Sequence, residues 1–197
     1  MIITPREPLG PDMPAVRKIH VPAKTGILLV VVAFLFVAGR SEAASIEIVA
    51  LGTSNTYGDG VARQDTYPAQ LETLLRAKGV DARVINAGVD SETSARMVAR
   101  LESAVPSGSR LVLIELHQNN EIRGGTSGQT RQNLAAIKAW LQARKIKYID
   151  VSTIMAGYVM AGRSSPLKMP DGRHLNRDGY ARVANAVLPQ VMVAIRK

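Results

Sequence analysis

Short apolar runs alternate with helical patterns from residue 45 to the C-terminus, and this alternation limits the possible folds more than any other feature. Strand-like runs occupy residues 45–51, 82–88, 110–116 and 146–152. Apolar spacing and turn signals predict helices over residues 67–79, 92–104, 129–144 and 177–195. Strands that alternate with helices imply a parallel sheet with helices on both faces. We therefore predict an α/β fold, a three-layer α/β/α sandwich around a parallel sheet of four to five strands.

The run RLVLIEL, residues 110–116, is almost entirely apolar, as expected for a central strand buried on both faces. The segment between the last predicted strand and Asp171, residues 153–170, is too short for another complete βα unit. This spacing predicts a core of four strands and leaves room only for a short fifth. In open parallel sheets, ligands bind beyond the carboxyl ends of the strands.

The N-terminal segment has the order of a secretory signal. A continuous apolar run, residues 27–37, follows basic residues and precedes the small-residue stretch GRSEAAS. At about 1.5 Å per residue the run spans roughly 17 Å, short of a hydrocarbon core of about 30 Å. We expect residues 1–43 to be a signal peptide cleaved after Ala43, with no permanent membrane span. An uncleaved anchor is the alternative.

The domain expected after cleavage covers residues 44–197, and a signal of this kind predicts a periplasmic or secreted product. Residues 1–12 contain proline and acidic residues that no signal needs, so we expect translation to start at Met13.

Charge and cysteine content narrow the classes of function. The net charge is +9, but the basic residues are scattered and do not form a run with interleaved aromatic residues, so we expect no nucleic-acid partner. The absence of cysteine excludes disulfides, thiolate metal sites and a cysteine nucleophile. His20, His117 and His174 lack the spacing of metal ligands, and we predict neither a metal nor a cofactor.

Polar residues follow the predicted strands at the sheet edge where a ligand is expected. Ser54 follows the first strand, Gly88 ends the second, Asn119 follows the third, and the sequence DGRH precedes the last helix. Acyl transfer requires a nucleophile, a base, a group that orients the base, and donors for an oxyanion. These clusters supply each chemical type.

The roles follow from the chemistry of each side chain. His174 can accept the Ser54 proton, and Asp171 can hold the other ring nitrogen of the imidazole. The backbone N–H groups of Ser54 and Gly88 and the side-chain amide of Asn119 can donate to an oxyanion. Each residue alone has an ordinary explanation, such as a helix cap or a turn, but their joint position favours catalysis.

Four segments carry a resemblance to a known family, the SGNH hydrolases, also called GDSL esterases and lipases. ALGTSNTYGDGV, INAGVDSET, IELHQNNEIRGG and DGRHLNRDGY resemble its four sequence blocks, and the similarity runs over residues 46–186. The resemblance implies a flavodoxin-like SGNH fold and an ester or thioester hydrolase that acts through an acyl-serine. The stretches TYPAQLETLL and NNEIRGGTSGQTRQNLAAI look most like the periplasmic acyl-thioesterase and lysophospholipase group.

The chain departs from the family pattern next to the expected site. Thr53 stands where the family usually has Asp, Asn55 where it has Leu, and His117 and Asn120 where it has Gly and Asp. We expect Asn55, His117 and Asn120 to line the substrate pocket. The expected partner is a small acyl ester or a lipid, and the oligomeric state stays open. A non-catalytic SGNH-like binding module and a carbohydrate O-acetylesterase are the alternatives.

Overall fold

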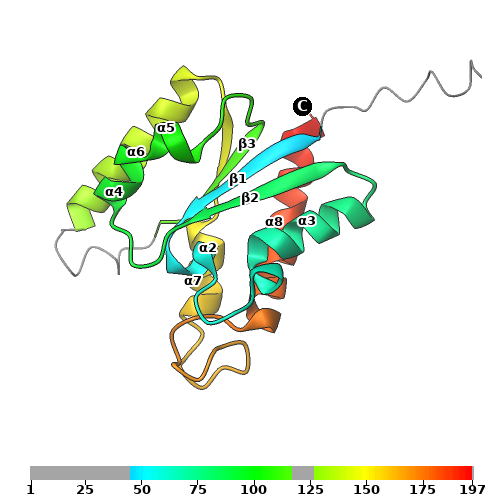
Figure 1. The fold of residues 1–197 in the computed structure, drawn as a ribbon. Helices are drawn as coiled ribbons and strands as arrows, with labels where there is room; N and C mark the ends of the chain where they lie inside the picture. The colour runs from blue at the N-terminus through cyan, green and yellow to red at the C-terminus, as the bar shows by residue number, and fades with distance from the viewer. Residues whose placement is uncertain (1–44, 117–126, 197) are drawn as a thin grey trace, which may run out of the picture. The chain divides into compact units, whose positions relative to one another are not determined.

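A computed structural model describes residues 45–116 and 127–196 of the chain. A parallel sheet lies at its centre (Figure 1), with the strands β1 (Ile46–Gly52), β2 (Ala82–Gly88), β3 (Leu111–Ile114) and β4 (Lys147–Asp150). The strand order is β2-β1-β3-β4, and each neighbouring pair is parallel. The predicted parallel sheet is confirmed with four strands, and the described residues contain no fifth.

Helices cover both faces of this sheet (Figure 1). The helices are α2 (Ser54–Tyr57), α3 (Tyr67–Ala77), α4 (Ser94–Ala99), α5 (Leu101–Ala104), α6 (Ser127–Ala143), α7 (Ser152–Val159) and α8 (Arg177–Arg196), with a 3-10 turn η1 (Arg63–Asp65). Buried side chains of α3, α7 and α8 pack on one face, and those of α4, α5 and α6 pack on the other. This arrangement confirms the predicted three-layer sandwich.

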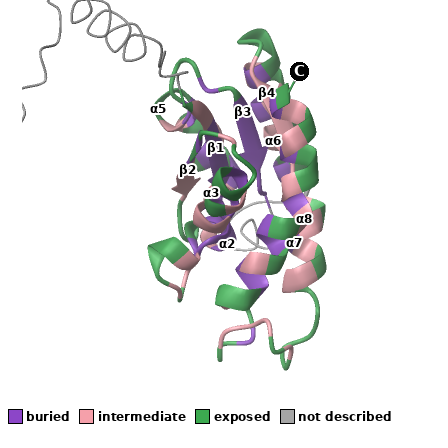
Figure 2. Ribbon diagram, turned by 90° about the vertical axis from the view of Figure 1, so that its right-hand side faces the viewer, coloured by how far each residue is buried: buried purple, intermediate pink, exposed green. Residues whose placement is uncertain are grey.

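The two faces of β1 belong to two separate hydrophobic clusters. Ile48 and Ala50 pack with α3 and α8, whereas Val49 and Leu51 pack with α4, α5 and α6. All four side chains are fully buried, and Figure 2 shows β1 and β3 coloured as buried between helices that expose their outer faces. Because successive strand residues point to opposite faces, a strand covered on both sides must be apolar throughout.

Three helical regions differ from the expectation, and the one-turn helix α2, which was not predicted, is the first. The helix predicted over residues 92–104 is divided into α4 and α5 at Arg100, whose φ of −103° and ψ of 7° interrupt the helical backbone. Thr93 caps α4, and its hydroxyl accepts the N–H of Arg96 at 3.4 Å. Helix α7 was not predicted, because its short apolar sequence STIMAGYV follows the last strand directly.

The predicted signal segment and its cleavage site after Ala43 lie outside the described residues. Residues 44–197 form one compact unit. Across residues 45–116 and 127–196, none of the helices combines the length and the apolar character that crossing a bilayer requires.

Two glycines give a matched test of packing. A Cβ at Gly88 would lie 2.6 Å from the carbonyl carbon of Thr56, whereas a Cβ at Gly157 in α7 would contact nothing within 4 Å. We expect Gly88→Ala to lower the free energy of unfolding by about 1–3 kcal/mol, because the added methyl overpacks rigid backbone. Gly157→Ala should raise it by about 0.5–1 kcal/mol, because alanine favours helix. Urea unfolding followed by circular dichroism measures both, and equal stability of the two variants would contradict this packing.

Candidate active site

Ser54 lies on a tight turn between β1 and α2 at the carboxyl edge of the sheet. It is the first residue of α2 and is separated from the end of β1 only by Thr53. The N–H groups of Tyr57 and Gly58 donate to the carbonyl oxygens of Thr53 and Ser54, at 2.8 and 2.9 Å. Gly58 ends the turn at a φ of 84°, a left-handed conformation that favours glycine. The turn therefore sets the half-buried Ser54 at the edge where ligands are expected.

Helix α2 sits so close to the sheet that two strand residues must be glycine. A Cβ at Gly52 would collide with the Thr56 hydroxyl and would lie 2.7 Å from Oε2 of Glu115. Gly88 is paired with Gly52 in the β1–β2 register, and a Cβ there would collide with the backbone nitrogen of Tyr57. These two glycines allow the turn to rest directly on the ends of β1 and β2.

The structure brings the predicted nucleophile, base and orienting acid together. Nε2 of His174 lies 3.3 Å from Oγ of Ser54, and Nδ1 of His174 lies 2.7 Å from Oδ2 of Asp171. For Nε2 to accept the serine proton, Nδ1 must carry the other proton and donate it to Asp171. The loop between α7 and α8 thus supplies a base and a carboxylate to a serine 120 residues earlier.

Hydrogen bonds keep Asp171 ionised. Partial burial of the carboxyl raises its pKa, but the backbone N–H of Arg173, the His174 ring and the His174 backbone N–H outweigh this and lower the pKa to about 2. The two N–H groups donate to Oδ1 at 2.8 and 3.1 Å, which leaves Oδ2 for the imidazole. Asp171 is therefore an anion at neutral pH and can stabilise an imidazolium.

A second carboxylate, not predicted from the sequence, faces the same ring nitrogen. Oδ2 of Asp59 lies 3.5 Å from Nδ1 of His174, and the N–H of Asp59 donates to the carbonyl oxygen of Ser54 at 3.1 Å. The residue belongs to the glycine-rich loop YGDG that follows the nucleophile. An acid so close in sequence to the serine was the available signal, but only the fold sets its distance from His174.

The oxyanion donors are only partly within the described residues. Asn119, predicted as the side-chain donor, lies outside them, as do the predicted pocket residues His117 and Asn120. The N–H of Gly88 donates to Oδ1 of its own strand neighbour Asn86 at 3.0 Å. Its predicted role as an oxyanion donor requires that bond to open and stays a prediction. The role of the Ser54 N–H, in the first turn of α2, also stays a prediction.

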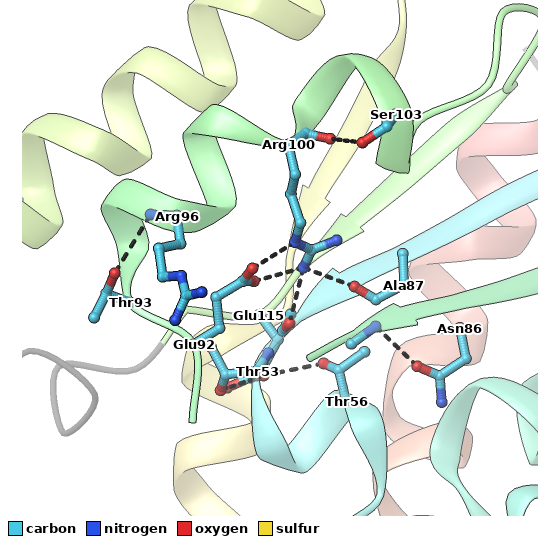
Figure 3. Close-up of polar contacts among 12 residues, drawn as sticks. Thr53, Thr56, Asn86, Ala87, Glu92, Thr93, Arg96, Arg100, Ser103 and Glu115 are labelled. Carbon is cyan, nitrogen blue, oxygen red and sulfur yellow. Dashed lines mark hydrogen bonds and ion pairs between the residues drawn. The ribbon is translucent and has the colours of Figure 1, made fainter. Parts of the chain in front are cut away.

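A buried carboxylate lies beneath the nucleophile turn. Glu115, which directly follows β3, is fully buried, and its Oε2 accepts the N–H and the hydroxyl of Thr53 at 2.9 and 3.2 Å. The same oxygen accepts the Thr56 hydroxyl at 3.0 Å (Figure 3). The family pattern usually has Asp at position 53, and here the residue that follows β3 supplies a carboxylate that binds Thr53. Sequence reasoning missed Glu115 because it sits inside an apolar run.

An ion pair fixes the segment after β2 against the same strand ends (Figure 3). The Arg100 guanidinium donates to both carboxylate oxygens of Glu92, each at 2.6 Å. It also donates to the carbonyl oxygens of Ala87 at 2.9 Å and Gly52 at 3.4 Å. The Glu92 side chain is 5% exposed, so a bidentate pair with further hydrogen bonds satisfies an otherwise costly buried charge. One side chain therefore joins α4 to the ends of β1 and β2.

A cavity of about 400 Å³ opens beside the nucleophile and the base. Its lining consists of Ser54, Asn55, Val159, Met160, Gly162, Arg163, Lys168, Gly172, Arg173 and His174. Asn55, predicted as a pocket residue, is among them. The basic residues were not predicted, because the loop that carries them has no regular pattern. In the described part of the chain, no group of three His, Asp or Glu side chains is arranged to hold a metal ion.

Comparison with known proteins gives a consistent family. Residues 50–191 match the model of the GDSL-like Lipase/Acylhydrolase family. The chain is 28% identical over 155 residues to esterase TesA of Pseudomonas aeruginosa, an alignment that covers 78% of this chain and 71% of that protein.

Two solved structures are similar to this chain, and the first shares its fold. Esterase EstA from Pseudoalteromonas sp. superposes with a TM-score of 0.65 at 18% identity, over 77% of this chain and 99% of that one. AlinE4, an SGNH-hydrolase family esterase, aligns at 40% identity with a TM-score of 0.49. That alignment spans little more than half of each chain, 53% of this one and 57% of AlinE4.

The two carboxylates at Nδ1 of His174 predict a shared orienting role. We expect Asp171→Asn to lower kcat for a nitrophenyl ester by about 10²-fold, because Asp59 still faces the imidazole. Asp59→Asn alone should cost less than about fivefold, and the double variant should lose more than the product of the single effects. Asp81→Asn, which removes an exposed acid before β2, is the control. A double variant equal to Asp171→Asn would show that Asp59 has no part in orienting the base.

Proposed function

Because residues 50–191 match its model, the chain belongs to the GDSL-like lipase/acylhydrolase family, and we propose that it hydrolyses small carboxylic esters through an acyl-Ser54 intermediate. The observation that carries this proposal is the chain of contacts from Oγ of Ser54 to His174, at 3.3 Å, and on to Asp171, at 2.7 Å. A binding module would need no such alignment of nucleophile, base and acid, so the enzymatic function is favoured.

The geometry supports a two-step reaction. Oγ of Ser54 attacks the ester carbonyl carbon as its proton moves to Nε2 of His174, and the Asp171 carboxylate stabilises the resulting imidazolium. The imidazolium then gives this proton to the leaving alcohol, and the acyl group remains on Ser54. A water molecule then gives a proton to Nε2 of His174 as it attacks the acyl-serine carbonyl. When the C–Oγ bond breaks, the imidazolium returns this proton to Oγ of Ser54 and the carboxylic acid is released. Donors at the turn, with Asn119 proposed among them, would stabilise each tetrahedral oxyanion.

The cavity supports small substrates over long acyl chains. Its volume of about 400 Å³ lies at the lower end of ligand pockets, and Val159 and Met160 are its large apolar lining residues. Thioesters react by the same nucleophilic chemistry, so short acyl thioesters belong to the proposal as further substrates. Lysophospholipids, which the sequence resemblance also suggests, should be poorer substrates because their acyl chains are long. We also propose that the enzyme acts in the periplasm or outside the cell, on the basis of the apolar run at residues 27–37.

Active-site labelling tests the nucleophile. EstA was crystallised as a form inhibited by monoethylphosphonate, which supports the choice of a phosphonate probe. We expect a fluorophosphonate to label Ser54, and Ser54→Ala or His174→Ala to lower ester turnover by about 10³-fold or more. Ser107→Ala, an exposed serine between α5 and β3, is the control and should keep full activity. A folded protein that stays unlabelled at Ser54, or Ser54→Ala with full turnover, would refute the proposed mechanism.

Export is tested by the N-terminus of protein made in its native cell. We expect a mature chain that begins at Ala44, because Ser41 and Ala43 match the small residues before a signal cleavage site. Fractionation followed by mass spectrometry of the N-terminal peptide measures this. Recovery only of chains that keep residues 27–37, in the membrane fraction, would support an anchor instead.

A further inference from the structure

The cavity beside Ser54 is lined by three cations and by no acidic residue among the described part of the chain. Arg163, Lys168 and Arg173 all belong to the loop between α7 and α8 that also carries the base. The guanidinium groups of Arg163 and Arg173 lie on exposed residues, and no carboxylate in the described segments pairs with either. Unpaired arginines at a catalytic cavity are available to bind an anion.

Backbone and side-chain packing hold these cations at the catalytic turn. A Cβ at Gly172, whose φ is 64°, would lie 3.1 Å from Cβ and 3.3 Å from Cγ of Arg163, so the arginine stem packs on that turn. The Lys168 ammonium donates to the carbonyl oxygen of Gly172 at 3.1 Å. Arg173 directly precedes His174, and its N–H donates to Asp171. The positive charges are therefore built into the same turn that presents the base.

The acids near the site do not neutralise this lining. Asp171 and Asp59 both face Nδ1 of His174, at 2.7 and 3.5 Å, whereas Ser54 faces the opposite nitrogen, Nε2. Neither acid lines the cavity. The two carboxylates are thus committed to the imidazole, and a substrate at Ser54 meets the basic lining.

An unpaired polar group in the lining points to a polar ligand. Asn55 is 8% exposed, and its side-chain oxygen is buried without a hydrogen-bond partner among the described residues. That oxygen can only accept a hydrogen bond, whereas the NH2 group of the same side chain can donate to a substrate oxygen, and Asn55 lines the cavity. The Asn55 NH2 group therefore adds a polar donor to the basic lining.

We propose that the cavity selects esters that carry an anionic group, a carboxylate or a phosphate, held by Arg163 and Arg173 while Ser54 attacks the carbonyl. This inference rests on the proposed esterase function and names its substrate class. The anion is recognised by charge and by guanidinium hydrogen bonds, and Asn55 contacts a polar part of the same substrate.

Two matched pairs of esters test the selection. Mono-4-nitrophenyl adipate and methyl 4-nitrophenyl adipate differ by one negative charge on the acyl side, and 4-acetoxybenzoate and its methyl ester differ by one charge on the alcohol side. For each pair we compare the ratio of kcat/KM, anionic over neutral, between variants, because this comparison cancels the intrinsic reactivity of the esters. The pair in which the anionic ester is preferred also shows whether the anion binds on the acyl side or on the alcohol side of the scissile bond.

The variants remove charge and keep the packing. Arg163→Gln retains the Cβ and Cγ that pack on Gly172, and Arg173→Gln retains the N–H that binds Asp171. We expect the double variant to lower the ratio by about tenfold or more in at least one pair, because cavity charges attract a substrate anion. The matched control is Arg83→Gln with Arg110→Gln, which removes the same charge from exposed residues where β2 begins and before β3 begins. That control should leave the ratio unchanged.

Salt supplies a second readout, since rising ionic strength should lower the ratio in the wild type and lower it less in the Arg163/Arg173 double variant, which keeps only Lys168 of the three cations. Unchanged ratios in both pairs, or an equal loss in the control variant, would overturn the inference. The proposed function would still be upheld in that case if the wild type hydrolyses the neutral esters through Ser54. Failure of the wild type to hydrolyse any of the four esters would instead contradict the proposed function itself. Fluorophosphonate labelling of each variant at Ser54 shows that its catalytic turn is still folded.

Discussion

The nucleophile turn depends on the hydrogen bonds that Thr53 and Thr56 donate to the Glu115 carboxylate. One oxygen of this fully buried side chain accepts hydrogen bonds from the Thr53 backbone N–H and from the hydroxyls of Thr53 and Thr56. A buried carboxylate without such donors would be strongly unfavourable, so carboxylate and turn stabilise each other. Because Glu115 follows the central strand β3, the turn before Ser54 is fixed to the most buried part of the sheet. The Arg100–Glu92 pair fixes the neighbouring segment after β2 in a similar way.

Charge is distributed around His174 in a manner that suits its chemistry. Two carboxylates face Nδ1, where an imidazolium formed during acyl transfer needs an opposite charge. The cavity beyond Ser54 is lined instead by arginine and lysine, which can attract an anionic substrate without pairing with the acids at the base. One short loop, from the end of α7 to the start of α8, supplies Asp171, His174 and all three cations. The same loop therefore presents the base and carries the proposed determinants of specificity.

Much of the fold was predictable from local patterns. The strands were predicted because burial on both faces requires near-continuous apolar runs, as in Leu111–Ile114. The division of residues 92–104 at Arg100 was not predictable, because the backbone there breaks where the guanidinium binds groups of two distant strands. Gly88 was predicted as a backbone donor to an oxyanion, but the group that requires glycine at this position in the structure is the backbone of α2. A glycine in a sequence can indicate that another group packs closely against the backbone, but it does not identify that group.

The sequence by itself determined the alternation of the four strands with the longer helices, the family blocks, and the chemical identity of Ser54, Asp171 and His174, since each depends on local residue types and spacing. Tertiary structure alone decided the groups that act on them. The Glu115 carboxylate beneath the turn, the Asp59 carboxylate at the imidazole and the basic lining of the cavity come from separate segments. Their effects depend on distances of about 3 Å between charged and polar atoms, because electrostatic and hydrogen-bond energies fall steeply with separation. No local pattern specifies such distances, and the packing of the chain sets them.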